Sequence, residues 1–547
     1  MSELNLQTTS VWHGAPLPAV QAESHFGDRV VQAFKDRAHS IFELLQNTVT
    51  QHPDRLALVC GSERLTWREV DVQAARLAAC FAHAGLVAGG RVVLFQGNST
   101  AFVMAFMAIQ RLGAIAVAVG AREQRAGLTW ILQHCGAKAV VCDADLLDRL
   151  PSQDEALDWQ WTLVNGPCPE PSAAWGRVFS FQEGLAFDPL TEVAPVHEED
   201  TAIILYTSGT TGRPKGAMLT HFNVLHSVQH YVTCMGLSCD DRSMLGVPVT
   251  HVTGLIANLM SMVGVGGALL ILPSFKADDF LQMAEMEGMT HTLMVPAMYK
   301  LLLMSPRFDK FNLSSWRIGG FGGAPMPPST IDEMAVKLPH LHLLNAYGAT
   351  ETTSPTTLMP MGKTRDHLDS VGQVLPCAQV LVMDEQGHQL PPGVVGELWI
   401  SGPMVVKGYW NDAAATAREM TAGWWHSGDL GSVDAQGYVR IFDRKKDMIN
   451  RGGYKIFSVE VENVLLEIPG IVEAAIVGVA CPVLGERVHA VVHTLRSDFT
   501  LQNLQFFCEK RLADYKVPET LRISAHPLPR NPNGKIIKRE LRAQTVQ

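Results

Sequence analysis

An eleven-residue stretch, Tyr206 to Gly216 (YTSGTTGRPKG), combines residue types that bind phosphate groups. Small residues let backbone N–H groups approach phosphate oxygens, hydroxyls donate to the same oxygens, and a lysine adds a point charge. The order differs from a Walker loop, because Pro214 removes an N–H that such a loop requires. The stretch predicts a phosphate-binding loop directly after an apolar strand at residues 202–205. Its predicted ligands are Thr207, Ser208, Gly209, Thr210, Thr211, Gly212 and Lys215.

Five further motifs follow this stretch along the chain. They are Gly322-Gly323-Ala324-Pro325, Asn345 to Glu351 (NAYGATE), Trp425 to Asp429 (WHSGD), Arg444 to Glu462 (RKKDMINRGGYKIFSVEVE) and Pro529 to Lys535 (PRNPNGK). Together the motifs resemble the signature of the adenylate-forming superfamily, which includes acyl- and aryl-CoA synthetases, nonribosomal adenylation domains and beetle luciferases. The resemblance covers roughly residues 40–545, which is nearly the whole chain.

The resemblance implies a nucleotide site in the first four motifs and at Arg444, the first residue of the fifth. Tyr347 offers an aromatic face to adenine, and Thr350 donates to the α-phosphate. Glu351 supplies a hard oxygen ligand for Mg²⁺, which needs few protein ligands when phosphates provide the rest. Asp429 accepts from the ribose hydroxyls, and Arg444 reaches ribose or phosphate. The remaining residues assigned to the nucleotide are Gly323, Ala324, Pro325, Asn345, Ala346 and Gly348.

The last hundred residues supply a second set of candidates. By resemblance, Lys535 bridges the carboxylate and the α-phosphate and stabilises the charge that develops as the two anions react. Lys446 is the hinge about which the small domain rotates. Gly453 lines the channel for the pantetheine thiol, and Lys455 contacts AMP. The resemblance therefore implies two conformations, one for each half-reaction.

The acyl pocket is implied to contain His251, Thr253, Phe321 and Gly348. None of these side chains is charged, which argues against amino acids and short dicarboxylates, because a buried charge needs a partner. Relatives restricted to acetate carry tryptophan at the position of Gly348, so we expect a larger acid and predict that this side of Gly348 opens onto the pocket. The alternative is a glycine kept for a positive φ. A medium- or long-chain fatty acid or an aryl acid fits this pocket.

The elements that position these residues alternate along the chain. Helix-like and strand-like segments succeed one another from Ser40 to about residue 350, which favours α/β units with mostly parallel strands. Short strands separated by glycine turns between residues 370 and 443 are typical of a small barrel or distorted sheet. We interpret residues 150–200 as a surface connection and residues 1–40 as an irregular extension.

Five consecutive charged residues, 443–447, mark a second boundary. We therefore divide the chain into an N-terminal extension (1–40), a large N-terminal domain (41–443), a hinge (444–446) and a C-terminal domain (447–547). The expected fold class is α/β. The large domain should contain two α/β subdomains and a small β-barrel-like subdomain, and the C-terminal domain should be a small, mobile α+β unit.

Composition excludes several other classes. A net charge of −10 and a pI of about 6.1 argue against a nucleic-acid binder. Ten cysteines without a CxxC pair indicate neither a zinc site nor a disulfide framework and suit a reducing compartment. The N-terminus lacks the pattern of a signal peptide. The apolar run at residues 255–272 is at the short limit for a membrane span, so we interpret it as a core helix, a turn and a buried strand.

The sequence thus predicts a cytoplasmic carboxylic acid–CoA ligase that uses ATP, Mg²⁺ and coenzyme A. Its partner is a small-molecule carboxylic acid, with no nucleic acid and no stable membrane span, and the oligomeric state stays open, a dimer being one option. The alternative is a stand-alone acyl-AMP ligase that loads the phosphopantetheine of an acyl carrier protein. A luciferase-like oxygenase and a non-catalytic nucleotide sensor are less favoured, the latter because Glu351 and Lys535 are both intact.

Overall fold

The computed structural model describes residue 12 and residues 17–151, 159–167, 175–207, 213–530 and 536–544. The chain divides into two compact units. Unit 1 comprises Met1–Val380, Ile400–Trp425 and Gln436–Val439. Unit 2 comprises Leu381–Trp399, His426–Ala435 and Arg440–Gln547. The chain therefore leaves unit 1 and returns to it twice before the C-terminal residues.

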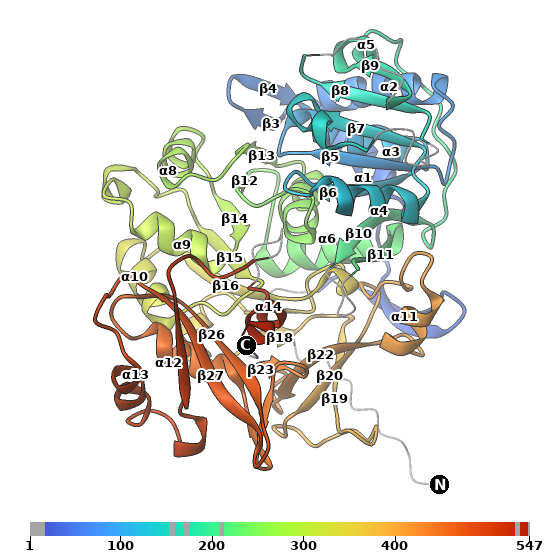
Figure 1. Cartoon of the computed structure of the whole chain (residues 1–547). Coiled ribbons are helices and arrows are strands. Elements are labelled where there is room, and N and C mark those ends of the chain that lie inside the picture. Colours follow the sequence, from blue (N-terminus) through green and yellow to red (C-terminus); the bar gives the residue numbers. More distant parts are fainter. Residues whose placement is uncertain are drawn as a thin grey trace. The chain divides into compact units, whose positions relative to one another are not determined.

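The first sheet of unit 1 has seven strands in the order β11-β10-β6-β5-β7-β8-β9 (Figure 1). Neighbouring strands are parallel, except that β10 and β11 form an antiparallel pair at the edge. The strands are β5 (Arg91–Gln96), β6 (Ile115–Gly120), β7 (Ala139–Asp143), β8 (Trp161–Asn165), β9 (Arg177–Ser180), β10 (Thr201–Thr207) and β11 (Lys215–Thr220). This arrangement confirms the predicted α/β alternation.

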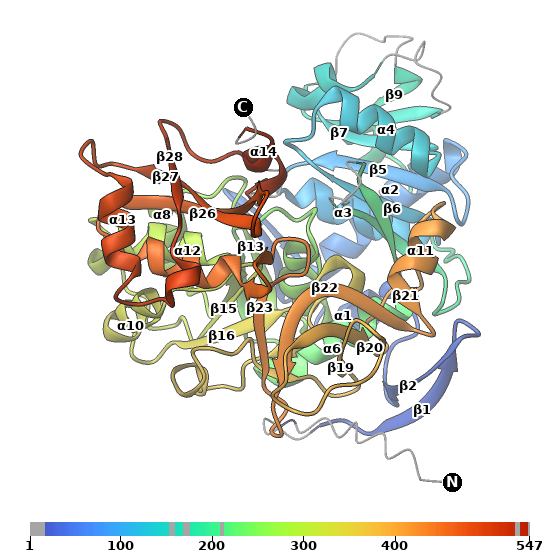
Figure 2. The same cartoon turned by 60° about the horizontal axis from the view of Figure 1, so that its bottom comes forward.

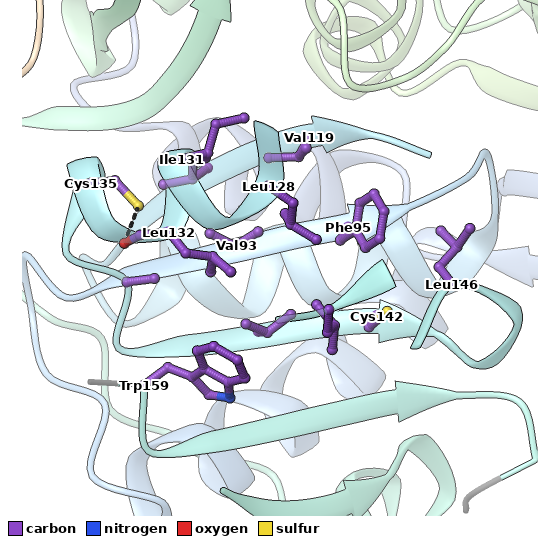
Figure 3. Packing of buried hydrophobic residues seen from close by; sticks show 14 of the residues in the cluster. Val93, Phe95, Val119, Leu128, Ile131, Leu132, Cys135, Cys142, Leu146 and Trp159 are labelled. Carbon is purple, nitrogen blue, oxygen red and sulfur yellow. Dashed lines mark hydrogen bonds between the residues drawn. The ribbon is translucent and has the colours of Figure 1, made fainter. Parts of the chain in front are cut away.

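One face of this sheet packs against α4 (Arg125–Cys135). The helix buries Leu128, Ile131 and Leu132 at the spacing of a single helical face. These side chains form one cluster with residues of β5 to β8, including Val93 and Phe95 (Figure 3). The helix α3 (Thr100–Arg111) contacts β5 and β6, and α5 (Phe181–Leu185) contacts β8 and β9. The helix α2 (Trp67–His83) packs against both of these helices.

The second sheet of unit 1 has nine strands in the order β18-β17-β16-β15-β14-β12-β13-β3-β4. The six strands from β16 to β3 are parallel, and β4, β17 and β18 pair antiparallel at the two edges. The strands are β3 (Leu56–Cys60), β4 (Glu63–Thr66), β12 (Arg242–Leu245), β13 (Ala268–Ile271), β14 (His291–Met294), β15 (Ile318–Gly322), β16 (His342–Tyr347), β17 (Thr357–Leu358) and β18 (Gln373–Val374). The two sheets confirm the prediction of two α/β subdomains.

The other helices of unit 1 connect these strands. They are α1 (Ile41–Gln51), α6 (His221–Met235), α7 (Ser261–Val265), α8 (Ala277–Met286), α9 (Pro296–Leu303), α10 (Pro328–Lys337) and α11 (Ala413–Glu419). Short 3₁₀ helices span Ala144–Arg149, Phe308–Lys310, Thr350–Thr352 and Thr364–Asp366.

The apolar run at residues 255–272 forms a helix, a turn and the buried strand β13, as predicted. Its first part, Thr253–Met260, is a π-helix that continues into α7. The fully buried Asn258 holds it against the nine-stranded sheet, because its side chain bonds Ser243 Oγ at 3.1 Å and the Leu293 N–H at 3.1 Å. In the part of the chain that the structure covers, every helix is too short or too polar to cross a lipid bilayer.

Two segments are more ordered than the sequence suggested. Residues 20–34, predicted as irregular, form the antiparallel hairpin of β1 (Val20–His25) and β2 (Arg29–Phe34) (Figure 2). The prediction was wrong because the buried apolar residues, Val31, Ala33 and Phe34, are few. The other buried residues of the hairpin, His25 and Arg29, are polar and hide the alternation in the sequence. Residues 150–200, predicted as a surface connection, contribute β8, β9 and α5, whose apolar residues lie among polar ones in the sequence.

Buried histidines of α6 hold the N-terminal segment. His226 Nε2 accepts a hydrogen bond from the Phe34 N–H at 3.2 Å, and His221 Nδ1 accepts one from the Ile41 N–H at 3.2 Å. Both histidines must be neutral to accept these bonds. Burial lowers the pKa of His226 to about 3 and that of His221 to about 4.

We therefore expect the protein to lose stability as the pH falls below about 6.5. Between that pH and about 4, the unfolded chain binds protons that the folded histidines do not, so the folded state becomes less favourable. At pH 5 the loss for His226 alone is about 2 kcal/mol. Thermal unfolding followed at pH 8, 6.5 and 5 measures the effect, and His226→Gln should flatten the dependence. A melting temperature that stays constant across this range would contradict the expectation.

Unit 2 has its own sheet, with the order β25-β24-β27-β26 and β28 beside β27. Apolar residues of α12 and α13 form one cluster with sheet residues that include Ile476. Leu541 of α14 forms a second cluster with Val477. Since Ile476 and Val477 are consecutive in β26, the two clusters lie on opposite faces of the sheet. The elements are β24 (Ile449–Arg451), β25 (Tyr454–Ile456), α12 (Ser458–Leu466), β26 (Ile471–Cys481), β27 (Gly485–Thr494), α13 (Leu501–Cys508), a 3₁₀ helix (Asp514–Lys516), β28 (Thr520–Ser524) and α14 (Lys538–Ala543). This is the predicted small α+β fold.

The remaining sheet has five short strands in the order β19-β20-β22-β21, with β23 beside β22. The strands are β19 (Gln379–Met383), β20 (Gly396–Ser401), β21 (Met420–Thr421), β22 (Trp424–Val433) and β23 (Val439–Arg444). This sheet corresponds to the small barrel-like subdomain expected from the short strands and glycine turns between residues 370 and 443.

Candidate functional site

The phosphate-binding stretch connects β10 to β11. In the antiparallel register of these strands, Thr207 lies directly opposite Lys215. The two candidate residues thus form the base of the connection, one at the end of each strand. Ser208, Gly209, Thr210, Thr211 and Gly212 lie outside the described residues.

Glu351 is brought to this base from a distant part of the sequence. It lies in the 3₁₀ helix Thr350–Thr352 and is only 8% exposed. Thr207 Oγ1 donates to Glu351 Oε1 at 3.3 Å, and the Tyr409 hydroxyl lies 3.0 Å from the same oxygen. Among the described residues, no lysine, arginine or histidine lies within ion-pair distance of this carboxylate. A buried carboxylate with neutral donors alone favours the binding of a cation.

Lys215 has partners that the sequence did not suggest. Its ammonium forms an ion pair with Glu419 and lies 4.2 Å from the centre of the Tyr409 ring. Burial acts to raise the pKa of Glu419, but the hydrogen bonds from Lys215, Arg418 and Tyr409 outweigh it and keep that pKa below its ordinary value. Glu419 therefore stays ionised. Neither Tyr409 nor Glu419 falls in a motif that we recognised, and their spacing carries no signal that could have identified them.

The carboxyl ends of β15 and β16 bring a second group together. In their parallel register, Phe321 lies beside Asn345 and Gly322 beside Ala346. Phe321 is buried, and Tyr347 at the end of β16 is partly exposed. Gly323, Ala324 and Pro325 follow β15 directly and are exposed, with Gly323 at a φ of +77°. Two motifs that are separated in the sequence therefore lie side by side at the carboxyl ends of neighbouring parallel strands, where ligands bind in open α/β sheets.

Gly348 differs from its expected role. A Cβ atom there would lie 3.2 Å from the Cα atoms of Ser354 and Pro355 and from Ser354 Oγ, so the segment 354–355 occupies the direction that we expected to be open. The φ of Gly348 also lies outside the left-handed region. The residue is small because another part of the backbone approaches closely, and Ser354 Oγ is itself held by the Tyr231 hydroxyl at 2.9 Å.

We accordingly expect Gly348→Ala to reduce activity equally with acids of all sizes. The methyl group would push residues 354–355 away, and overfilling a packed site costs about 1–3 kcal/mol, which corresponds to roughly a ten-fold loss or more. The measurement is kcat/KM with propionate, octanoate and benzoate. A selective loss with the larger acids would instead favour a substituent that enters the acyl pocket.

His251 and Thr253 lie at the start of the π-helix. The His251 N–H donates to Pro248 O at 3.1 Å, and Thr253 is its first residue. A Cβ at Gly254 would lie 2.4 Å from Pro248 O, so glycine is required for this tight entry into the helix. π-Helical segments occur frequently at functional sites, because the extra residue per turn redirects side chains.

Unit 2 carries the other charged candidates. Arg444 Nε lies 2.6 Å from Asp429 Oδ1, and Arg444 Nη1 donates to Ser427 O at 3.3 Å. Asp429 is 4% exposed, and its N–H donates to Ser427 Oγ at 3.0 Å. The two predicted nucleotide ligands therefore form a direct ion pair between the strands β22 and β23.

The turn after β24 explains two glycines. Gly452 and Gly453 form the two-residue connection between β24 and β25 and have φ values of +59° and +90°. Such a tight hairpin needs positive φ at both positions. Lys455, on β25, is exposed and lies 3.3 Å from Glu385. Lys446 is exposed in the turn between β23 and β24, and Lys535 lies outside the described residues.

Two surface hollows, of about 270 and 210 Å³, lie elsewhere in unit 1. Their linings come from α1 and from residues near 240 and 265, and they include none of the candidate residues. We give more weight to the polar contacts around Glu351, because an open hollow without convergent polar groups is not a site for chemistry.

Two protein-family models match the chain. Residues 45–410 match the model described as AMP-binding enzyme. Residues 460–535 match the model described as AMP-binding enzyme C-terminal domain.

Curated relatives and solved structures cover almost the full length. The chain is 32% identical over 493 residues to a feruloyl-CoA synthase of Amycolatopsis sp., covering 90% of this chain and 96% of the relative. It is 31% identical over 507 residues to the long-chain-fatty-acid–CoA ligase FadD13 of Mycobacterium tuberculosis, covering 92% and 97%. The structure of the O-succinylbenzoate coenzyme A synthetase of Bacillus subtilis in complex with ATP and a magnesium ion is similar, with a TM-score of 0.80, 26% identity, and coverage of 92% of this chain and 99% of that chain.

Proposed function

The chain belongs to the AMP-binding enzyme family, and from this premise we propose how its residues carry out the activity. The protein is an acid–thiol ligase that forms acyl-CoA. In the first half-reaction the acid carboxylate attacks the α-phosphorus of ATP and pyrophosphate leaves, which gives acyl-AMP. In the second, the thiol of coenzyme A attacks the acyl carbonyl, loses its proton and expels AMP.

The contact of Thr207 with Glu351 is the observation that supports our assignment most strongly. It joins the phosphate-binding stretch to a carboxylate 144 residues later in the sequence. ATP and Mg²⁺ are required for the reaction. The donor set around Glu351 fits the metal, because the ion prefers oxygen ligands and no described lysine, arginine or histidine pairs with this carboxylate. We assign Glu351 as the protein ligand of Mg²⁺, which neutralises charge on the phosphates.

The other nucleotide contacts follow from the motifs. We assign the phosphates to Thr207, Lys215 and Thr350, and to the connection at residues 208–212. Adenine is assigned to the sheet edge formed by residues 322–325 and 345–348, with Tyr347 as the aromatic platform. A half-buried aromatic ring beside exposed small residues supports this assignment, since a flat ligand can lie against both.

Unit 2 supplies the groups that we assign to the ribose, to the hinge and to each of the two half-reactions. Asp429 accepts from the ribose hydroxyls, and its ion pair with Arg444 supports this role because the guanidinium holds the carboxylate in one orientation. Lys446 is proposed as the hinge, Lys455 as an AMP contact and Gly453 as part of the thiol channel. Lys535 is proposed as the catalytic lysine of the first half-reaction.

For the acid we propose a medium- or long-chain fatty acid or an aryl acid. The named relatives act on such acids, namely feruloyl and long-chain fatty acyl groups. The remaining candidate pocket residues, His251, Thr253 and Phe321, include no acidic or basic side chain other than the histidine. Transfer to an acyl carrier protein instead of free coenzyme A is not favoured. A dimer and a cytoplasmic location remain our predictions.

Pyrophosphate release across a panel of carboxylic acids, with and without coenzyme A, tests this function. We expect release with aryl or medium- to long-chain acids, and a thioester product only when coenzyme A is present. Amino acids and succinate should be poor substrates, because a buried charge needs a partner. Acyl-AMP that accumulates in the presence of coenzyme A, and is consumed only by a carrier protein, would contradict the assignment.

A further inference from the structure

Tyr409 lies between two groups to which we assign the metal and the phosphates. Its hydroxyl lies 3.0 Å from Glu351 Oε1 and 2.8 Å from Glu419 Oε2. Its ring faces the ammonium of Lys215 at 4.2 Å from the ring centre. The residue is 2% exposed, so these contacts are made almost entirely without water.

Backbone hydrogen bonds to three other parts of the chain hold the segment around Tyr409 in place. Tyr409 pairs with Ala217 of β11 as an isolated antiparallel bridge, and the neighbouring Trp410 N–H donates to Gly216 O at 2.7 Å. The Val406 N–H donates to the Glu351 carbonyl at 3.0 Å. The Tyr409 N–H donates to Thr416 Oγ1 at 2.9 Å. The segment 406–410 is therefore tied both to the phosphate-binding hairpin and to the residue Glu351.

A phenol has one proton to donate, yet two carboxylate oxygens lie within reach of this one. Glu419 has two cationic partners, Lys215 and Arg418, the latter at 2.8 Å. Glu351 has only hydroxyl donors among the described residues. The hydrogen bond from the phenol therefore stabilises the Glu351 carboxylate more than the Glu419 carboxylate, because Glu351 has no cationic partner among the described residues.

We propose that Tyr409 is a positioning residue for the metal-binding carboxylate. Its hydroxyl holds Glu351 in one orientation, and the Lys215–Glu419 ion pair fixes the hydroxyl from the other side. The Glu351 side chain is therefore already ordered before the cation binds, with its second oxygen available as a ligand. Binding then costs less conformational entropy. This inference rests on the proposed function, because it takes Glu351 to be the Mg²⁺ ligand.

The test is Tyr409→Phe, which removes one oxygen atom and keeps the ring over Lys215. The readout is the Mg²⁺ concentration that gives half-maximal pyrophosphate release. We expect it to rise about ten-fold, the scale of one hydrogen bond to a charged group, while the rate at saturating Mg²⁺ stays within a few-fold of the wild type. Tyr299→Phe is the matched control, because Tyr299 is also buried and donates to Gly320 O at 2.7 Å, away from the metal site.

A second measurement distinguishes positioning from a general structural effect. In a Glu351→Gln background, Tyr409→Phe should change the Mg²⁺ dependence no further, because residues that act through one another are not additive. The Mg²⁺ constant, unlike total activity, does not depend on the folded fraction. A wild-type Mg²⁺ constant in Tyr409→Phe, or an equal rise in the Glu351→Gln background, would overturn the inference. Failure of the proposed function is distinct, since the wild type itself would then release no pyrophosphate.

Discussion

Replacing Lys535 with alanine is expected to reduce acyl-AMP formation from acid and ATP by about 10²–10³-fold, the loss typical of removing one group that stabilises transition-state charge. The acid carboxylate and the α-phosphate are both anionic as they approach each other, and the ammonium of Lys535 is the group that we assign to offset their repulsion. Thioester formation from supplied acyl-AMP should remain within a few-fold of the wild type, because that step no longer joins two anions.

The two half-reactions are measured separately, by pyrophosphate release and by release of AMP from synthetic acyl-AMP with coenzyme A. Lys446→Pro serves as the opposite variant. Proline fixes φ near −65° at the proposed hinge, so adenylation should persist while thioester formation falls. If Lys535→Ala slows both half-reactions equally, the division of labour between two conformations is wrong.

Glu351→Gln should produce the second large effect. The amide has nearly the same shape as the carboxylate and can still accept from Thr207 and Tyr409, so we expect the fold to be retained. It lacks the charge that draws a divalent cation to this buried position, and kcat/KM for ATP should fall by about 10²-fold or more, equivalent to roughly 3 kcal/mol. Part of the loss should be recovered at high Mg²⁺ concentrations, which would identify metal binding as the step affected.

The matched control for this variant is Glu333→Gln. Glu333 is an exposed glutamate that pairs with Lys300 at 3.1 Å, and exposed ion pairs contribute little to stability. Its removal should leave both kinetics and melting temperature unchanged. Wild-type kinetics in Glu351→Gln at every Mg²⁺ concentration would mean that Glu351 is only a structural carboxylate.

The sequence predicted the two α/β sheets and the main candidate residues because these features depend on the spacing of residues close together in the chain. The apolar strand before Thr207 and the alternation after Ser40 depend only on neighbouring residues, and both are present in the structure. The hairpin at residues 20–34 was missed because its stability comes from distant contacts, such as the bond between the Phe34 N–H and His226. Local pattern carries no information on a partner nearly two hundred residues away.

Contacts between residues distant in the sequence also explain why two residues of the site were not predicted. Tyr409 and Glu419 acquire their roles only when the segment 406–410 pairs with β11. Gly348 illustrates the opposite case, in which the direction of an open pocket was inferred from the small residue and from the tryptophan of acetate-specific relatives. The close approach of Ser354 and Pro355, which the sequence cannot reveal, accounts for the glycine in this structure.

The order of strands in unit 1 has a consequence for synthesis on the ribosome. The seven-stranded sheet is complete when residue 220 has emerged, since all its strands lie between residues 91 and 220. The nine-stranded sheet must wait, because β3 pairs with β13, more than two hundred residues later. The early sheet can therefore fold as an insertion while the β3–β4 pair remains without β13, the neighbour of β3 on its other side. Slow translation after residue 220 would prolong the exposure of the apolar strand β3, so chaperone demand should peak at this stage rather than at the end of synthesis.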